Sequence, residues 1–263
     1  MGSLGTQGLP PSPPALGADP PLTQAKTEEG VLNIIVSGVG GQGTVLAGKL
    51  LAQCALASGA FVRSAETIGM AQRGGSVLGH VRIAWKRENS NGTNGYGDSM
   101  GSDGTAPLLS PVSSVASPLV PQGQAQLLIG FEPAETLRAY PFCGSGALVV
   151  TATAPLLPPT ASLQRLSYDG TAQLAALAEE ARAGRIATLV LVDNAAVLAA
   201  LGFDKALNVV LLGAALAALE ASGFASPALS YAAVQHTLTT TLAPQYREPN
   251  LQALEIGYKL PCR

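Results

Sequence analysis

The chain has few cysteines, and their spacing does not suit a metal site. Cys54, Cys143 and Cys262 lie far apart, with no Cys-x-x-Cys pair and no histidine-rich segment beside them. Zinc sites and iron–sulfur clusters are held by closely spaced ligands, so the sequence predicts neither. The absence of a disulfide pattern fits a reducing compartment, and we expect the protein to reside in the cytoplasm.

Charge and long apolar runs are also scarce. Charged residues make up 12% of the 263 residues and the formal net charge is −2, which argues against a nucleic acid partner. The longest apolar run, residues 209–219, is too short to cross a bilayer. No charged region followed by an apolar region marks a secretory signal. A hydrophobic content of 47% suffices for one sizeable core, so we expect a soluble globular protein without a membrane partner.

Residues 1–30 differ in composition from the rest. They contain six prolines and five glycines and almost no large apolar side chains. Such a segment cannot bury enough surface to offset the entropy lost on ordering, so we predict a disordered tail followed by one domain over residues 31–260.

Residues 31–58 predict a buried strand, a glycine loop and a helix. Residues 31–36 are apolar apart from Asn33, as in a central parallel strand. Gly38, Gly40 and Gly43 then follow the spacing G-x-G-x-x-G, which permits a tight turn and close approach of a phosphate to backbone N–H groups. An alanine- and leucine-rich helix over residues 44–58 would point its N-terminus at the loop, so the natural ligand is an anion.

This motif alone is unspecific, because many dinucleotide-binding domains share it. Such domains place an acidic residue at the end of a second strand, where it binds a ribose hydroxyl. Glu66, after a predicted strand over residues 60–65, comes nearest to that position, but a glycine-rich loop with an arginine follows it at once. NAD or FAD binding therefore stays an alternative.

The glycine-rich loop over residues 66–76 is the second informative segment. Its glycines allow another molecule to approach the backbone, while Gln72, Arg73 and Ser76 supply hydrogen-bond donors. The next strand, residues 77–85, places His80 and Arg82 on one face. This part of the chain is locally positive, which suits either an anionic ligand or a solvated basic edge.

Strands and helices alternate in the rest of the chain. Residues 88–117, rich in Asn, Gly and Ser, predict a flexible insertion. After it we predict strands over residues 126–131, 147–151 and 189–193, and helices over residues 134–140, 171–182 and 194–201, the last capped by Asn194. This order predicts an α/β fold with a doubly wound, mainly parallel sheet, helices on both faces and a helical C-terminal part.

The C-terminal part begins with an apolar helix over residues 208–219. It is apolar nearly all round and contains small residues, so it is either a buried helix or a subunit contact. Asn208 either caps this helix or contacts a ligand or loop. Two amphipathic helices are predicted over residues 230–241 and 250–258.

Five segments in this order resemble one family. They are Gly38-Val-Gly-Gly-Gln-Gly43, Gly69-Met-Ala-Gln-Arg-Gly-Gly-Ser-Val77, His80-Val-Arg82, Phe131-Glu-Pro133 and Asn208-Val-Val-Leu-Leu-Gly213. Together they resemble the gamma-type domain of 2-oxoacid:ferredoxin oxidoreductases, and most closely the beta subunits of indolepyruvate ferredoxin oxidoreductases. The resemblance covers about residues 31–260, interrupted by the insertion. In that family a histidine commonly precedes the Gly-Met-Ala-Gln segment, whereas Ile68 stands here.

The resemblance implies a subunit of a hetero-oligomer that converts an aryl 2-oxoacid and coenzyme A into acyl-CoA, CO2 and reduced ferredoxin. Thiamine diphosphate, magnesium and [4Fe-4S] clusters would belong to a larger alpha subunit, with coenzyme A as co-substrate and ferredoxin as acceptor. The lack of cysteine clusters and of an evident acid–base constellation agrees with this division, so we expect no cofactor or metal bound by this chain alone.

From these segments we predict the site residues. Arg73 and Gln72 would take the catalytic roles, with Arg73 neutralising a substrate carboxylate or a coenzyme phosphate. The residues expected to bind the cofactor or co-substrate are Gly38, Gly40, Gly41, Gln42, Gly43, Gly69, Met70, Gly74, Gly75, Ser76 and Asn208. Two other functions remain open: a stand-alone nucleotide-binding oxidoreductase, and a structural adaptor in which both glycine loops only allow tight subunit packing.

Overall fold

A computed structural model describes residues 29–68, 75–87, 109–110, 115–156, 168–224, 226 and 228–261. The predicted tail, apart from its last two residues, lies outside the described residues, as does most of the insertion. The same holds for the predicted site residues Gly69, Met70, Gln72, Arg73 and Gly74.

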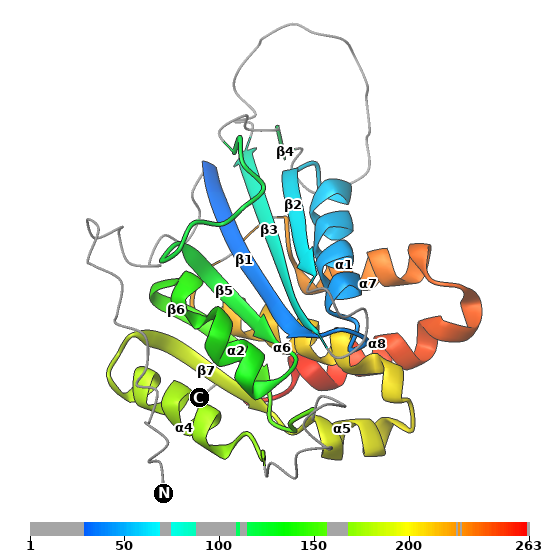
Figure 1. Cartoon of the computed structure of the whole chain (residues 1–263). Coiled ribbons are helices and arrows are strands. Elements are labelled where there is room, and N and C mark those ends of the chain that lie inside the picture. The colour runs from blue at the N-terminus through cyan, green and yellow to red at the C-terminus, as the bar shows by residue number, and fades with distance from the viewer. Residues whose placement is uncertain are drawn as a thin grey trace, which may run out of the picture.

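One mixed sheet organises the chain (Figure 1). Its strand order is β2-β3-β1-β5-β6-β7, and the short β4 pairs with the outer part of β3. Strands β1, β5, β6 and β7 are parallel, whereas β3 runs antiparallel to both β1 and β2. The strand bounds are β1 Glu29–Val39, β2 Phe61–Ile68, β3 Ser76–Arg87, β4 Leu109–Ser110, β5 Ala125–Gly130, β6 Cys143–Ala152 and β7 Ile186–Val192.

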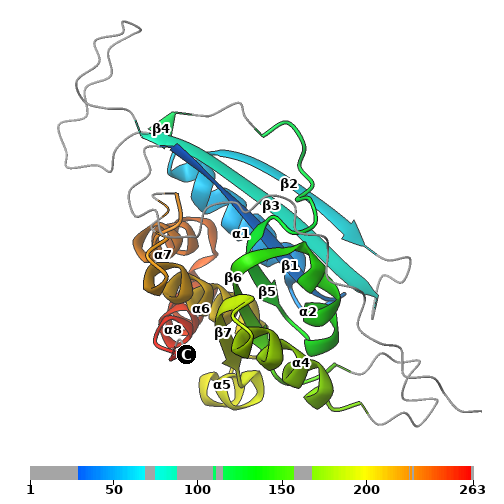
Figure 2. The ribbon, with the colours of Figure 1, turned by 90° about the vertical axis from the view of Figure 1, so that its left-hand side faces the viewer.

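Helices cover both faces of the sheet, as predicted (Figure 2). The core on one face joins β1 to α1, α6, α7 and α8, and the core on the other joins β1 to α2 and α4. The helix bounds are α1 Thr44–Ala57, α2 Pro133–Ala139, α4 Thr171–Arg182, α5 Asn194–Leu201, α6 Leu207–Ala221, α7 Tyr231–Thr241 and α8 Pro244–Tyr258. The mainly parallel, doubly wound prediction with a helical C-terminal part is confirmed.

Strand β1 lies at the centre because its side chains are apolar on both faces. Ile34 and Val36 are fully buried in the core beneath α1 and α6, while Ile35 is fully buried on the opposite face. A strand covered in this way is typical of a central position in a doubly wound sheet. The predicted buried strand is therefore confirmed, and its C-terminal end delivers the glycine loop to one edge of the sheet.

Helix α6 is buried inside the chain rather than left for a subunit contact. Its residues from Leu207 to Leu216 are all at most 8% exposed. The axes of α6 and α8 approach closely where Gly213 faces the backbone of Leu254 and Gly257 faces the backbone of Val210. Of the two interpretations left open for this helix, the buried helix is the one observed.

His80 and Arg82 share one face of β3, whereas Val81 and Ile83 pack in the core on the other, as predicted. Arg82 Nε donates to Asn33 Oδ1 at 2.8 Å. His80 is buried against the Phe142 ring, and its Nδ1 accepts a hydrogen bond from Val120 N at 3.2 Å. An imidazole in such a place favours the neutral form, and burial lowers the pKa of His80 from its usual 6.5.

Acidification below pH 6.5 is therefore expected to destabilise the fold through His80. The unfolded chain takes up a proton near pH 6.5 and the folded chain only at lower pH, so this contribution is complete above 6.5 and is lost as the pH falls towards the folded pKa. The slope for one proton is at most about 1.4 kcal/mol per pH unit. Urea unfolding at pH 7.0 and 5.5 should show a smaller loss in His80→Gln than in the wild type. A matched change at the exposed His236 should leave the loss unaltered.

Candidate functional site

The glycine loop joins the end of β1 to the start of α1, and its neighbours pack so closely that a side chain at Gly38 would clash with them. A Cβ on Gly38 would lie 2.7 Å from Phe131 Cβ and 2.8 Å from Thr44 Oγ1. Gly43, the N-cap of α1, has a φ of 89°, a left-handed conformation that favours glycine. The loop backbone is thus brought close to the ends of β1 and β5.

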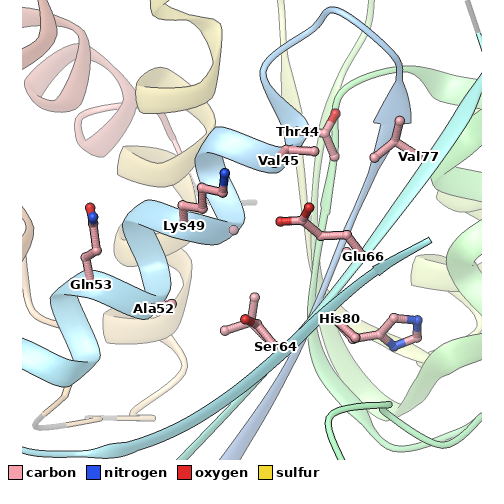
Figure 3. A pocket seen from close by; sticks show the side chains of 13 residues that line it. Thr44, Val45, Lys49, Ala52, Gln53, Ser64, Glu66, Val77 and His80 are labelled. Atoms are coloured by element: carbon pink, nitrogen blue, oxygen red, sulfur yellow. The ribbon is translucent and has the colours of Figure 1, made fainter. Parts of the chain in front are cut away.

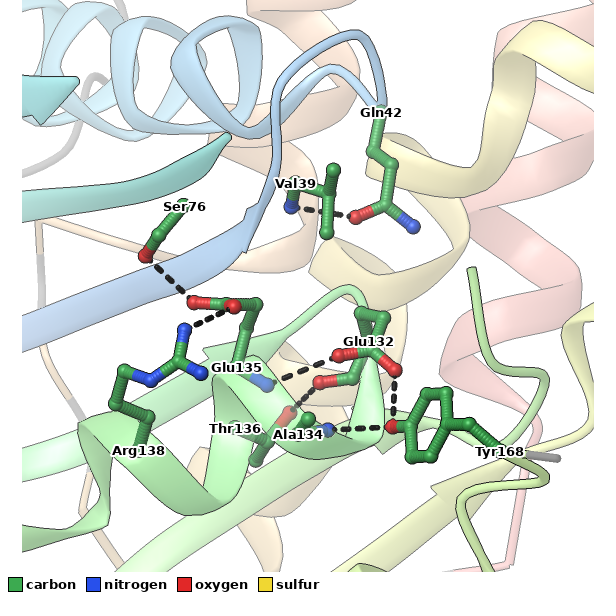
Figure 4. Close-up of polar contacts among 9 residues, drawn as sticks. All are labelled: Val39, Gln42, Ser76, Glu132, Ala134, Glu135, Thr136, Arg138 and Tyr168. Atoms are coloured by element: carbon green, nitrogen blue, oxygen red, sulfur yellow. Dashed lines mark hydrogen bonds and ion pairs between the residues drawn. The ribbon is translucent and has the colours of Figure 1, made fainter. Parts of the chain in front are cut away.

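The side-chain amide of Gln42 holds this loop in its conformation through two hydrogen bonds. Its Oε1 accepts from Val39 N at 2.7 Å (Figure 4). Its Nε2 donates to Phe131 O at 3.0 Å. The side-chain amide therefore closes the loop on itself and ties it to the end of β5. This is an internal role that the sequence did not reveal, while the predicted ligand contact of Gln42 stays a prediction.

The end of the second loop lies directly against the first. Gly40 N donates to Gly75 O at 2.8 Å, and Ser76 pairs with Val39 at the end of the β1–β3 ladder. Of the predicted site residues in the second loop, Gly75 and Ser76 are thus placed beside Gly40. Both loops leave the sheet at the same edge, as the sequence interpretation requires.

Two buried glutamates at the start of α2, Glu132 and Glu135, form hydrogen bonds next to the ends of the two loops (Figure 4). Glu132 is 2% exposed and caps α2 by accepting from Glu135 N at 3.0 Å. Its other carboxylate oxygen accepts from the Tyr168 hydroxyl. Glu135 accepts from Ser76 Oγ at 2.6 Å and pairs with Arg138. The Phe131-Glu-Pro133 segment thus links the glycine loop, through Phe131 O, to the start of α2, through the cap formed by Glu132.

These two glutamates were not predicted as site residues. The spacing of an acidic residue, a proline and a second acidic residue is a helix N-terminus signature and could have predicted the cap. The hydrogen bond from Ser76 to Glu135 joins positions 59 apart in the sequence, so no local pattern could have revealed it. Burial, followed by the hydrogen bond to Glu132, raises the pKa of Tyr168, which therefore stays a neutral donor.

Removing either partner of the Ser76–Glu135 bond should cost stability, and the two costs should not add. We expect a coupling free energy of about 1.5 kcal/mol between Ser76→Ala and Glu135→Ala, since the bond is short, charged and partly buried. Chemical unfolding of the two single variants and the double variant measures it. The exposed Arg182–Glu179 pair of α4 serves as the control, with less than about 0.5 kcal/mol expected. Strict additivity at Ser76 and Glu135 would refute the tether.

A small cavity of about 170 Å³ lies over the first loop. It is lined by Val39, Gly40, Gly41, Gly43, Thr44, Val45 and Val77. The first turn of α1 faces it, has no acidic residue and has no side-chain cap. Such a helix start offers unpaired backbone N–H groups and a partial positive charge, which together favour an anion.

Two buried polar atoms near the start of α1 have no hydrogen-bond partner, and the residue of one of them, Thr44, lines this cavity. Thr44 is 4% exposed, and its Oγ1 has no partner. Asn208, 3% exposed, packs against Gly43, and its Oδ1 also has no partner. Asn208 does not cap α6, because the N-cap is Ala206. Buried polar groups are nearly always satisfied, so unpaired ones at a cavity point to a site that a ligand or partner completes.

The part of the chain that the structure describes offers little support for a metal site or for a reactive thiolate. That part contains no group of three or more His, Cys, Asp or Glu side chains able to hold a metal ion. Burial raises the pKa of the Cys143 thiol to about 12 and also raises that of Cys54, so neither is a thiolate nucleophile at neutral pH. Among the described helices, none is long and apolar enough to cross a membrane.

Comparison with known proteins places this geometry in a family. The family model described as pyruvate ferredoxin/flavodoxin oxidoreductase matches residues 33–101 and 109–260. Indolepyruvate oxidoreductase subunit IorB of Archaeoglobus fulgidus is 33% identical over 228 residues, which cover 86% of this chain and 94% of that protein. The subunit of the same name from Pyrococcus horikoshii is 30% identical over 227 residues, with the same coverage.

Solved structures share the fold. The gamma subunit of a keto/oxoacid ferredoxin oxidoreductase from Geobacter sulfurreducens superposes with a TM-score of 0.52 at 17% identity, covering 87% of this chain and 96% of that one. Pyruvate oxidoreductase subunit PORC from Thermotoga maritima gives 0.53 at 17% identity, covering 88% and 98%. The resemblance drawn from the five sequence segments is confirmed. The chain belongs to the pyruvate ferredoxin/flavodoxin oxidoreductase family.

Proposed function

We propose that this chain is the smaller subunit of a cytoplasmic, thiamine-diphosphate-dependent 2-oxoacid:ferredoxin oxidoreductase. With a larger partner subunit it would convert an aryl 2-oxoacid such as indolepyruvate, together with coenzyme A, into acyl-CoA, CO2 and reduced ferredoxin. The names and coverage of its relatives support this assignment. Thiamine diphosphate, magnesium and [4Fe-4S] clusters reside in the partner, and these groups supply the decarboxylation and the electron transfer.

The role of this chain is to hold negative charge at the edge of that active site. The observation that supports the proposal is the hydrogen bond from Gly40 N to Gly75 O, which brings the last residue of the second loop against the first loop. The first loop and the start of α1 bind a phosphate of coenzyme A, either in its diphosphate or at its 3′ position. Thr44 is a candidate contact for such a group, because it lines the cavity and its buried hydroxyl lacks a hydrogen-bond partner.

The second loop covers the thiamine pocket of the partner. Ser76 and Gly75 fix the C-terminal end of this loop against Glu135 and Gly40. Arg73, a few residues earlier, neutralises the substrate carboxylate or a coenzyme phosphate, and Gln72 supplies a further donor. A guanidinium suits this task because it stays charged and pairs with both oxygens of a carboxylate or phosphate.

Replacing Arg73 by alanine tests this role in the complex copurified with the larger subunit. The Michaelis constant for the 2-oxoacid or for coenzyme A should rise at least about tenfold, because one charge-assisted contact is lost. Arg63→Ala is the matched control, since Arg63 is an exposed cation on β2 that stacks on Phe61. An intact complex in which both constants stay unchanged would show that Arg73 makes no such contact. The isolated chain should not turn over substrate.

A stand-alone NAD or FAD enzyme is the alternative, and one topological fact disfavours it. In dinucleotide-binding domains the acidic residue that binds ribose ends the strand next to β1. Here β3 lies between β1 and β2, so Glu66 is one strand further away. NADH titration of the isolated chain, followed by fluorescence, should detect no binding. A purely structural adaptor, by contrast, would assemble with the partner and keep full activity after changes in both glycine loops.

A further inference from the structure

Helix α5, Asn194–Leu201, is apolar, yet none of its residues is buried. Its sequence, Asn-Ala-Ala-Val-Leu-Ala-Ala-Leu, contains no charged residue. Val197, Leu198 and Leu201 lie on one side of the helix and pack, partly buried, against the core. The opposite side is exposed and consists of alanines alone, which we call the alanine face: Ala195, Ala196, Ala199 and Ala200. A helix that is apolar on all sides is normally covered on all sides, so the alanine face is expected to be an interface.

The alanine face differs from the exposed sides of other helices on the outside of the molecule. Lys49 and Gln53 occupy exposed positions of α1 (Figure 3). Glu179 and Arg182 form an exposed ion pair on α4. Such sides suit contact with water, because their side chains form hydrogen bonds with it. The alanine face offers water no polar side chain.

Hydrogen bonds fix the start of α5 at the end of the sheet. Asp193 caps the helix by accepting from Ala196 N at 3.0 Å. Asn194 Oδ1 accepts from Ala154 N at 2.8 Å, in the segment that leaves β6. The alanine face is therefore held in one orientation, and a partner that binds it does not have to order it first.

The alanine face lies at the same edge of the sheet as the glycine loop. Helix α5 follows the C-terminal end of β7, and the loop follows the C-terminal end of the parallel strand β1 (Figure 1). Because β7 is the third strand from β1, the two strand ends are about 14 Å apart at the usual strand spacing. One side of a standard protein–protein interface covers about 800 Å², a patch roughly 30 Å across. A protein that contacts the glycine loop would therefore also reach α5.

We propose that the larger subunit binds the alanine face of α5 through an apolar surface of its own. This inference rests on the proposed function, which places that subunit against the glycine loops. Alanine side chains let a partner approach the backbone of α5 closely, and α5 has no side chain that could pair with a charge buried against it. Leu191, three residues before α5 in the sequence, is 46% exposed and adds apolar surface at this end of β7.

Ala199→Arg tests the proposal through assembly with the larger subunit. The dissociation constant of the two subunits should rise at least about 100-fold, because an unpaired charge would be buried in the interface. Analytical ultracentrifugation of mixtures of the purified subunits measures it. Ala175→Arg is the matched control, since it adds the same side chain at an exposed alanine of α4, one turn before Glu179, and should leave the constant unchanged. Equal Tm values would show that both variants fold.

Cysteine labelling tests whether the alanine face is covered, without adding a charge. In the isolated chain, Ala199→Cys and Ala175→Cys should react with a maleimide at similar rates above the background of the wild-type thiols. In the complex, labelling at position 199 should slow at least about tenfold, because the partner excludes the reagent, while labelling at position 175 stays fast.

The outcomes separate this inference from the proposed function. A wild-type dissociation constant for Ala199→Arg, or equal labelling at position 199 in the isolated chain and in the active complex, would overturn the inference and leave the proposed function standing. Slow labelling at position 199 already in the isolated chain would show that a second copy or a segment of this chain covers α5, and the inference would be wrong. If the chain did not bind the larger subunit at all, both would fail.

Discussion

Replacing Gly257 by alanine is expected to lower the free energy of unfolding by about 3 kcal/mol. An added Cβ would lie 2.0 Å from Val210 O, a distance that real Cβ atoms do not reach. The obstacle is backbone of α6 and cannot rotate away, so α8 has to move off the helix that fills the core. Gly213→Ala should act in the same way, because its Cβ would lie 2.3 Å from Leu254 O.

Thermal unfolding measures this effect, and a helical glycine elsewhere provides a control of opposite sign. For a chain of this size, a loss of about 3 kcal/mol lowers the Tm by roughly 10 °C. Gly48 lies inside α1, and a Cβ there would meet only Val81 Cγ2 at 3.8 Å, an ordinary contact. Gly48→Ala should therefore stabilise the chain by about 0.5 kcal/mol through helix propensity. A Gly257→Ala protein as stable as the wild type would show that α6 and α8 do not pack in this way.

Replacing Gly38 by alanine is expected to reduce kcat/KM for coenzyme A about 100-fold while the complex with the larger subunit still assembles. The new Cβ would lie 2.7 Å from Phe131 Cβ and 3.0 Å from Gln42 Oε1. Phe131 and Gln42 form the hydrogen bond that holds the loop in place, so the loop backbone has to shift to make room for the new Cβ. A displacement of about 1 Å in a binding site can cost a factor of about 100.

The control for Gly38→Ala has to separate displacement of the loop from general loss of stability. Gly123 has a φ of 75° and open space around it, so Gly123→Ala costs backbone strain without touching the loop. It should lower the Tm with little change in steady-state kinetics. Full activity with coenzyme A in the Gly38→Ala complex would mean that the position of the glycine loop is not needed for catalysis.

Local patterns predicted the elements well where composition leaves one choice. The apolar run before Gly38 and the alanine-rich segment after Gly43 predicted β1 and α1 to within a few residues. The predicted element boundaries were wrong where contacts with another segment determine where a helix begins. Asp193 caps α5 by accepting from Ala196 N, while Asn194, the predicted cap, accepts from Ala154 N in another segment. Helix α8 begins at Pro244 and continues through Pro249, because packing against α6 outweighs the cost of that proline.

The site depends on contacts that no local pattern contains. The sequence predicts strands on either side of the second loop, but not that β3 lies between β1 and β2. That order places Gly75 against Gly40 and moves Glu66 away from the first loop's own strand. The roles of Glu132 and Glu135 likewise arise from tertiary contacts with Tyr168 and Ser76. Pairings across the sheet follow from packing as a whole, which periodicity does not encode.

Thr44→Val, in the complex with the larger subunit, tests whether the glycine loop holds a phosphate of coenzyme A. This single variant has two readouts, and they are expected to change in opposite directions. The Thr44 hydroxyl is buried without a hydrogen-bond partner. A valine of the same shape should therefore raise the free energy of unfolding of the ligand-free protein by about 1 kcal/mol, and its Tm with it. If that hydroxyl serves a phosphate at the glycine loop, the same change should weaken coenzyme A binding about tenfold in a calorimetric titration. A raised Tm together with weakened binding is the predicted result. A raised Tm with unchanged affinity for coenzyme A would contradict the claim that the glycine loop holds its phosphate.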